Sequence, residues 1–420
     1  MSHFILADCN NFYVSCERLF NPKLDGIPVI VLSNNDGCVV ARSQEAKEMG
    51  IKMGVPYFQI QELCRNRVIV LSSNYQLYGN ISERIMNVLS QDAPEIEIYS
   101  IDEAFLKYPS FLSPEILFSE SMNFRRKIKK WLGLPVSFGI APTKTLAKIA
   151  NSLAKKKKEG VFSLCSRKVQ KEVLQNYPIE DVWGIGSRFS EKLKQMGVFT
   201  AWDFLIMDPL IIRKKMGVVG ERMLWELRGR SCLQLEEPKP KKSITSSRSF
   251  GRVITEKADL AEALATFTSN ACVKLRSQRS CASAVCVFLE AVLDAKLGTR
   301  RQYSSIRSFT SPTSDTPQII STAKAILSDL FVSDERYKKC GVILLDLIPE
   351  NLVMPDLFLE NCNPKRISLM KTVDALNARF GKNTLFFGAM GSKNPSWKSQ
   401  SKRLSKFNTT EWSALPVVKA

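Results

Sequence analysis

FILADCNNFYVSCERLF, residues 4–20, joins a strand pattern to a helix pattern and carries an acidic residue, Asp8, where the strand pattern ends. Three further apolar runs, PVIVLS at 28–33, VIVLSS at 68–73 and VSFGIA at 136–141, alternate with longer segments of helical pattern. Such alternation is typical of an α/β domain. We therefore predict an α/β domain whose first strand presents Asp8 at its end.

The rest of the chain predicts several further parts, since 420 residues leave room for two to four domains. Residues 34–56 indicate a subdomain inserted into the sheet, with a short helix stopped by a glycine. Glycine-punctuated helices at 178–232 predict a small all-helical module, and PKPKKS at 238–243 predicts an extended tether. Helix and strand patterns then predict a second lobe to about residue 349. Beyond it, residues 351–420 indicate a loosely folded tail that packs only against another molecule.

The charge balance favours nucleic acid as the partner. Sixty Lys and Arg residues face 41 Asp and Glu residues, a net charge of +19, which would repel itself without a polyanion nearby. Residues 122–171 hold fourteen basic residues against one acidic residue, and residues 239–310 hold thirteen against five. Each basic stretch taken alone is more often a solvated surface, but several in one chain predict a polyanion-binding protein.

Composition also excludes whole classes of mechanism. The single histidine, His3, rules out imidazole triads and clusters of imidazole ligands. The 11 cysteines include no CxxC pair, no signal peptide is visible, and no apolar run approaches the length of about 20 residues that a membrane helix needs. We expect a reduced, cytoplasmic protein without a membrane partner, whose catalysis rests on carboxylates, hydroxyls, lysines and metal ions.

Three carboxylates are candidates for such a metal site. Asp8 ends the first strand, and Asp102 with Glu103 follows the β-leaning run EIEIYSIDEAF. Converging carboxylates with open positions for substrate phosphates are typical of Mg²⁺ sites in nucleotide enzymes. Unrelated surface acids are the alternative, and spacing alone favours that alternative.

A candidate phosphate contact lies in VWGIGSRFSEKL at 182–193. We predict two helices joined by a hairpin on Gly184 and Gly186, with Ser187 capping the second helix. Free backbone N–H groups at that helix start would bind a phosphate oxygen, and Lys192 adds positive charge. A simple tight turn is the alternative.

In order along the chain, DCNNFYVSCE, NNDGCVVARSQEAKEMGIKMG, YSIDEAF, FGIAPTKTLAKIAN, VWGIGSRFSEKL and SSRSFG resemble the Y-family of translesion DNA polymerases, most closely the UmuC type that forms the catalytic subunit of DNA polymerase V. The resemblance implies a multidomain α/β right hand with a palm, small fingers, a helix-hairpin-helix thumb and a little finger lobe. The implied parts are palm at 1–25 and 75–171, fingers at 26–74, thumb at 172–235, linker at 236–244, little finger at 245–350 and C-terminal tail at 351–420.

The resemblance also implies the catalytic site. Asp8, Asp102 and Glu103 match the family's metal carboxylates, and the backbone carbonyl of Cys9 matches a further ligand, which implies two Mg²⁺ ions. Error-prone synthesis across DNA damage in the SOS response is the implied activity, and no proofreading exonuclease is recognisable in the sequence.

The same resemblance places the nucleotide. Tyr13 matches the steric gate beneath the sugar, with Phe12 before it; from the residues alone, both could equally be core packing. Gln44 and Lys47 stand where many relatives place Tyr and Arg on the incoming triphosphate, and Lys47 keeps the charge without the guanidinium fork. Lys155 matches a triphosphate-binding lysine.

The resemblance also implies contacts with DNA and with other proteins. Primer-template DNA is the implied polymer substrate, with Gly184, Gly186 and Lys192 in the thumb and Arg248 and Arg252 in the little finger as contacts. A UmuD′ dimer, RecA and the sliding clamp are implied protein partners. NLVMPDLFLE is the candidate clamp peptide, in which Leu357 and Phe358 preserve the apolar pair but Met354 replaces the usual Gln.

Two other functions share some of these features. A DNA-bound scaffold with an unused site would keep the basic regions, but the intact carboxylates argue against it. A nucleotide cyclase would share paired carboxylates but would need neither a helix-hairpin-helix nor a basic second lobe. Primer-template dependence separates both from a polymerase.

Overall fold

The computed structural model describes residues 2–237, 239–294, 299–354, 364–391, 395, 397–406 and 409. The chain divides into two compact units, which are described one at a time. Unit 1 comprises Met1–Ser33, Gly37–Glu237 and Arg403–Ala420, and unit 2 comprises Asn34–Asp36 and Pro238–Lys402.

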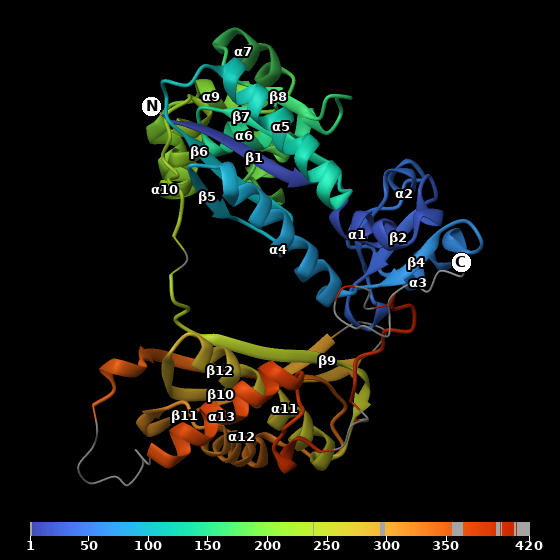
Figure 1. The fold of residues 1–420 in the computed structure, drawn as a ribbon, viewed down its shortest axis with the longest axis vertical. Coiled ribbons are helices and arrows are strands. Elements are labelled where there is room, and N and C mark those ends of the chain that lie inside the picture. Colours follow the sequence, from blue (N-terminus) through green and yellow to red (C-terminus); the bar gives the residue numbers. More distant parts are fainter. Residues whose placement is uncertain are drawn as a thin grey trace. The chain divides into compact units, whose positions relative to one another are not determined.

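A five-stranded sheet is the centre of unit 1 (Figure 1). Its strand order is β5-β6-β1-β7-β8, and the predicted first strand β1 lies in the middle, antiparallel to both of its neighbours. The strands are β1 His3–Cys9, β5 Glu95–Ile98, β6 Glu103–Tyr108, β7 Val136–Ala141 and β8 Val161–Ser163.

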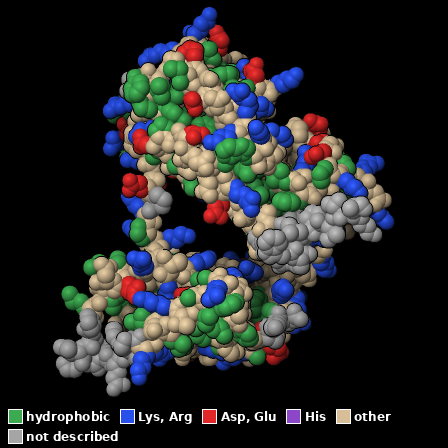
Figure 2. All heavy atoms as spheres, viewed as in Figure 1, with side chains coloured by type: hydrophobic (Ala, Val, Ile, Leu, Met, Phe, Trp, Pro, Cys, Tyr) green, Lys and Arg blue, Asp and Glu red, His purple; other side chains and the backbone are tan. Residues whose placement is uncertain are grey.

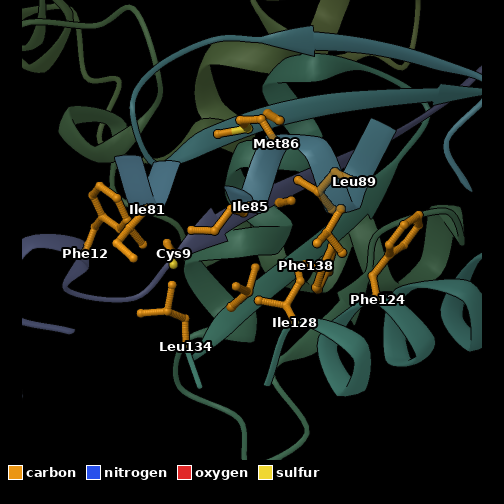
Figure 3. Packing of buried hydrophobic residues seen from close by; sticks show 14 of the residues in the cluster. Cys9, Phe12, Ile81, Ile85, Met86, Leu89, Phe124, Ile128, Leu134 and Phe138 are labelled. Atoms are coloured by element: carbon orange, nitrogen blue, oxygen red, sulfur yellow. The ribbon is translucent and has the colours of Figure 1, made fainter. Parts of the chain in front are cut away.

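Both faces of this sheet are covered by helices, so β1 is apolar on both sides. Ile5, Ala7 and Cys9 belong to one core, whereas Phe4 and Leu6 belong to a second core on the opposite face. Figure 3 shows the first core, in which side chains of β1 and β7 meet those of two long helices. Helices α1 Phe12–Phe20, α4 Tyr75–Asp92 and α5 Pro114–Leu132 contribute to the first core, and α6 Lys144–Ala154, α7 Arg167–Gln175, α8 Ser187–Gln195, α9 Ala201–Ile206 and α10 Pro209–Leu227 to the second.

The apolar runs at 28–33 and 68–73 form a separate, three-stranded sheet of order β3-β2-β4. This sheet has a small core of its own. The insertion predicted at 34–56 is therefore larger than expected, because the two apolar runs that flank it belong to this sheet and not to the five-stranded one. The elements of this region are η1 Pro22–Leu24, β2 Val29–Leu32, β3 Val39–Arg42, α2 Gln44–Glu48, α3 Tyr57–Cys64 and β4 Ile69–Ser72, and η2 Asn34–Asp36 is counted with unit 2.

The hairpin before α8 differs from the prediction in two ways. The preceding segment is a single 3-10 turn, η3 Ile179–Asp181, rather than a full helix. The prediction of Ser187 as the cap was wrong: the cap is Gly186, and Ser187 is the first helical residue. The Gly186 carbonyl accepts the first intrahelical bond, from the Ser190 N–H at 2.9 Å, while its extended backbone has not yet entered the helix.

Unit 2 is built on a four-stranded antiparallel sheet of order β11-β10-β12-β9. Two helices pack on it around a core of its own. The elements are β9 Ile244–Ile254, α11 Lys257–Ser277, β10 Ser280–Asp294, β11 Thr299–Thr313, α12 Thr316–Leu330, β12 Tyr337–Pro349 and η4 Glu350–Leu352.

The prediction of a loosely folded tail was wrong for its described part. Helix α13 Pro364–Phe380 and the turn η5 Gly388–Met390 follow the sheet. The Trp397 ring is buried and meets the Phe267 ring edge-on at 5.4 Å, and Met390 packs against α11 and α12. Met390 and Trp397 of the tail therefore pack on this chain's own helices. The predicted clamp residues Leu357 and Phe358 lie outside the described residues.

Two negative findings apply to the described residues. None of their helices combines the length and apolarity needed to cross a membrane. Nine of the described cysteines carry free thiols: Cys9, Cys16, Cys38, Cys64, Cys165, Cys232, Cys272, Cys286 and Cys340.

Candidate active site

A cavity of about 770 Å³ in unit 1 brings several of the predicted residues together. It lies at the end of β1, where β6, α6 and α2 meet. Its lining includes Asp8, Gln44, Lys47, Glu103, Lys148, Asn151, Ser152, Lys155, Lys156, Tyr177, Asp181 and Trp183.

Sheet register brings Asp8 and Glu103 side by side. They are direct partners in the antiparallel pairing of β1 with β6, so their side chains leave the same face of the sheet. Asp8 lies on the same face of β1 as Leu6 and Phe4, because residues two apart on a strand share a face. Leu6 and Phe4 belong to the core that includes α6, so α6 covers this face. Both carboxylates consequently line the cavity.

Two lysines of the α6 segment neutralise this pair. Lys155 Nζ lies 2.7 Å from Asp8 Oδ2, and Lys148 Nζ lies 2.9 Å from Glu103 Oε2. Seven residues separate the lysines, which is two helical turns, so they project from one face. Burial raises the pKa of the Asp8 carboxyl, and the neighbouring Glu103 raises it further, whereas the Lys155 ammonium opposes the rise.

Asp102 is arranged differently from the other two carboxylates. It precedes β6, its Oδ1 accepts a hydrogen bond of 2.6 Å from the Ser100 hydroxyl, and its carbonyl accepts the Cys9 N–H at 2.9 Å. Adjacent residues of a strand point to opposite faces, so Asp102 does not follow Glu103 into the cavity. Within the part of the chain that the structure describes, no three His, Cys, Asp or Glu side chains are grouped as a metal site.

The donor chemistry nevertheless fits a hard divalent cation. Asp8 and Glu103 supply adjacent carboxylate oxygens, and a lysine ammonium already occupies a hydrogen-bonding position on each. Oxygen-rich sites with this negative charge are those that Mg²⁺ prefers. Asp102 is one residue from Glu103 in the sequence but is held by Ser100, so the structure brings two of the three predicted carboxylates into the cavity.

The two aromatic residues predicted to contact the nucleotide differ in their surroundings. Phe12 is buried in the first core, as Figure 3 shows, and is packing. Tyr13 is half-buried and lies almost parallel to the Tyr78 ring, with centroids 4.2 Å apart and an interplanar angle of 15°. Tyr13 lies close enough to Asp102 for that carboxylate to add to the rise in the tyrosine's pKa, which comes mainly from burial.

The α2 residues also reach the cavity. Lys47 Nζ donates to Asn11 Oδ1 at 2.6 Å, and Gln44 Nε2 donates to Glu48 Oε1 at 3.2 Å. Burial lowers the pKa of Lys47, and the nearby positive charges of Arg42 and Lys155 lower it further. The cavity therefore concentrates positive charge opposite the carboxylate pair.

Sequence reasoning missed Lys148 and Trp183. Lys148 had a usable signal, since its spacing of seven from Lys155 places both on one helix face. Trp183 had none: its ring lies 5.2 Å from Lys148 Nζ, which also sits 4.6 Å from the Tyr99 ring, and only the folded chain brings these together.

The residues predicted to contact DNA in unit 1 lie in the hairpin before α8 and in α8 itself. Gly184 has a positive φ of 91°, and a Cβ there would meet Met223 Sδ at 2.5 Å, so this hairpin position requires glycine. Gly186 caps α8, and Lys192 lies in its last turn. No side chain caps α8, and the first N–H groups of a helix have no partner within it.

In unit 2, both predicted arginines lie on β9, with Arg252 3.5 Å from Asp259. Lys and Arg side chains outnumber Asp and Glu on the visible face of each unit in Figure 2.

Comparison with known proteins identifies relatives over the whole chain. Residues 7–152 match the impB/mucB/samB family, residues 241–357 its C-terminal domain, and residues 368–418 a domain of unknown function. UmuC of Salmonella typhimurium is 40% identical across 99% of this chain and 100% of its own length, and ImpB of Salmonella typhimurium is 39% identical across 99% of both. In fold, the chain is similar to a Y-family polymerase chimera of Dbh and Dpo4, with a TM-score of 0.64, 22% identity, and coverage of 82% of this chain and 99% of that one.

Proposed function

Since the chain belongs to the impB/mucB/samB family of Y-family DNA polymerases, we propose that the cavity at the end of β1 is its nucleotidyl-transfer site, with Asp8, Asp102 and Glu103 as the catalytic carboxylates. The chain is a DNA-directed DNA polymerase for error-prone translesion synthesis and lacks proofreading. The observation that carries the site is the direct pairing of Asp8 with Glu103 inside a lysine-lined cavity.

The proposed site uses the divalent metal that Y-family polymerases generally require, here as two Mg²⁺ ions. Bound metal would lower the barrier for attack of the primer 3′-hydroxyl on the α-phosphate and would neutralise the leaving pyrophosphate. Asp8, Asp102, Glu103 and the Cys9 carbonyl are the proposed ligands. The carboxylates hold the negative charge that such ions need, and the sheet register keeps two of them at a fixed spacing.

Lysines in the cavity are proposed to bind the triphosphate. The Lys155 side chain is 41% exposed, so its ammonium can leave Asp8 for a phosphate oxygen without crossing buried space. Lys47 approaches from α2, and Gln44 beside it is proposed as a neutral hydrogen-bonding contact. Preorganised positive charge would stabilise the charge that develops on the transferring phosphate.

Sugar selection is assigned to Tyr13. Its ring is half-buried and supported from behind by Tyr78, so a 2′-hydroxyl placed against it would meet a surface that cannot retreat. Phe12, being buried, would contribute only through packing.

Primer-template DNA is proposed to contact the basic regions of both units. In this assignment residues 1–25 and 75–171 are the palm, 26–74 the fingers, 172–235 the thumb, 236–244 a linker, 245–350 the little finger and 351–420 the tail. Phosphate contacts are proposed at the start of α8, with Gly184, Gly186 and Lys192, and at Arg248 and Arg252 on β9.

Protein partners are proposed from the full-length relationship to UmuC. A UmuD′ dimer and RecA would act with this chain in the SOS response in the cytoplasm. The sliding clamp would bind through Leu357 and Phe358.

Primer extension on damaged and undamaged templates, with and without UmuD′ and RecA, tests this function. We expect template-directed extension past the lesion that depends on Mg²⁺ and increases with both partners. DNA binding without any primer-dependent extension, under every combination, would contradict it and favour a scaffold.

A further inference from the structure

The C-terminal strap, residues 403–406, is hydrogen-bonded into unit 1. The Ser72 N–H donates to the Arg403 carbonyl at 2.9 Å, and the Arg403 N–H donates to Ser72 Oγ at 3.0 Å, at the last residue of β4. Asn74 Nδ2 donates to Ser405 Oγ at 3.0 Å, and the Arg403 guanidinium lies 4.9 Å from the centre of the Tyr57 ring. These contacts fix the strap at several points on the unit that holds the catalytic cavity.

Within the strap, Ser405 contacts the buried carboxyl group of Glu17. Its hydroxyl donates to Glu17 Oε1 at 3.1 Å, and the same oxygen accepts the Tyr78 hydroxyl at 2.7 Å. Glu17 is only 3% exposed, and burial raises the pKa of its carboxyl. A buried carboxylate oxygen satisfied by two hydroxyl donors resists losing either one, because an unmade bond at such a site is costly.

The hydrogen bonds from Ser405 to Glu17 and from Tyr78 to Glu17 connect the strap to the Tyr13 ring, which stacks on Tyr78. Tyr78 is fully buried, its hydroxyl is held by Glu17, and its ring supports Tyr13 in the stacked geometry. Glu17 and Tyr13 are four residues apart on α1, so they share one face of that helix. Ser405, Glu17, Tyr78 and Tyr13 therefore form one continuous series of contacts from the strap to the proposed sugar-contacting ring.

We propose that the strap sets the position of Tyr13, and so takes part in the discrimination between deoxyribonucleotides and ribonucleotides. Ser405, Glu17 and Tyr78 are positioning residues, since they act through Tyr13 and do not touch the nucleotide. The proposal rests on the proposed role of Tyr13. The strap lies within residues 368–418, which match the domain of unknown function, so the proposal assigns a role to part of that domain.

The physical reason is that a steric barrier discriminates only while it is held in place. A Tyr78 ring freed from Glu17 would give Tyr13 room to yield to a 2′-hydroxyl, whereas a deoxyribose never presses against it. Loss of the strap contact should therefore change sugar selectivity more than it changes deoxynucleotide use.

Two full-length variants test the series from its two ends. Ser405→Ala removes the outer hydroxyl and Tyr78→Phe removes the inner one while keeping the stacked ring. We expect each to raise the ratio of ribonucleotide to deoxynucleotide incorporation by about two- to tenfold, the effect of one lost hydrogen bond, with kcat/KM for dNTP little changed. Ser401→Ala, an exposed serine in the same tail, is the matched control and should keep the wild-type ratio.

Two additional variants separate positioning from other causes. Ser405→Thr keeps a hydroxyl and should restore the wild-type ratio. Tyr13→Ala reports on the proposed function itself: an unchanged ratio in Tyr13→Ala would refute the role of Tyr13. A raised ratio in Tyr13→Ala together with wild-type ratios in Ser405→Ala and Tyr78→Phe would overturn the role of the strap alone. A fall in thermal stability without any change of ratio in these two variants would also overturn it, because the strap would then be purely structural.

Discussion

Phe12 and Tyr13 are neighbours in sequence with different surroundings. The Phe12 ring is 3% exposed and faces the core between β1 and α4, whereas Tyr13 is half-buried against Tyr78. Both residues belong to the first turn of α1, which follows a left-handed backbone at Asn11 with φ of 48°, and successive side chains of a helix point about 100° apart. Substituting Phe12 and Tyr13 one at a time can therefore distinguish an effect of core packing from an effect on nucleotide selection.

Tyr13→Ala should admit ribonucleotides, because it removes the ring proposed to oppose the 2′-hydroxyl. Deoxynucleotide use should survive better than selectivity does. The measurement is the ratio of rNTP to dNTP incorporation on one primed template.

Phe12→Ala provides the comparison for that measurement. Removing a buried ring should lower the free energy of unfolding by about 3–5 kcal/mol, and a selectivity effect should be secondary. If Phe12→Ala alone changed the sugar ratio, the gating role would belong to Phe12 and not to Tyr13.

At this scale the sequence predicted the individual chemical groups better than their orientation. Asp8 and Glu103 could be foreseen because strand ends bring carboxylates to one edge of a sheet. The separation of Asp102 from them could not, since it depends on a hydrogen bond to Ser100. The ion pair of Lys148 with Glu103 crosses 45 positions of sequence, so only its helical spacing from Lys155 gave a hint.

Among the elements, the contact of α6 with β7 determines where the cavity lysines lie. A Cβ on Gly139 of β7 would overlap the backbone nitrogen of Asn151 and the backbone oxygen of Ala147. The backbone of α6 therefore packs directly on the strand at this glycine. Asn151 strengthens the contact by donating from Nδ2 to the carbonyls of Leu6 and Ser137, at 3.2 and 2.8 Å.

Gly139→Ala should therefore push α6 off the sheet. We expect a loss of about 1–3 kcal/mol in the free energy of unfolding, the usual cost of overpacking, together with reduced nucleotide addition because Lys148 and Lys155 move. Thermal unfolding and primer extension measure the two effects.

Gly79→Ala is the matched control for this substitution. Gly79 lies on an exposed position of α4 with nothing within 4 Å of a Cβ, so alanine there should be neutral or stabilising. Equal stability of the two glycine variants would show that α6 tolerates displacement.

Periodic elements were predictable, and elements defined by distant contacts were not. The apolar runs at 28–33, 68–73 and 136–141 follow local patterns, and a strand lies at each of them in the structure. The cap of α8 was misassigned because serine is the commoner cap, whereas the tight hairpin placed Gly186 there. The tail was misread because Met390 and Trp397 find their apolar partners on helices more than 60 positions away in the sequence.

The whole molecule carries a net charge of +19, which predicts salt-sensitive DNA binding. Each phosphate neutralised should add roughly 0.9 to the slope of log affinity against log salt on duplex DNA. We expect a slope of several and little sequence preference, measured by titration at increasing salt concentration. A slope of about one or less would mean that most of the positive charge faces solvent or another protein.

The clamp interaction also belongs to this scale. Replacing Leu357 and Phe358 with Ala should weaken clamp pull-down and clamp-stimulated extension, because an apolar pair in a polar segment suits a hydrophobic pocket on a partner. Basal extension on short primed templates should stay unchanged. Persistent clamp binding in the double variant would place the contact elsewhere, and a fall in basal activity and thermal stability would make the segment structural.

The most direct measurement of the catalytic site compares nucleotide addition and DNA affinity on the same preparations of wild type, Asp102→Ala and Glu103→Ala. The carboxylates are proposed to act on the reacting phosphates through bound metal, whereas the basic regions hold the DNA. Both variants should therefore lose primer extension while keeping DNA affinity close to that of the wild type, because removing negative charge does not weaken binding to a polyanion. Substantial extension by either variant would remove that residue from the catalytic role and contradict the assignment of the cavity.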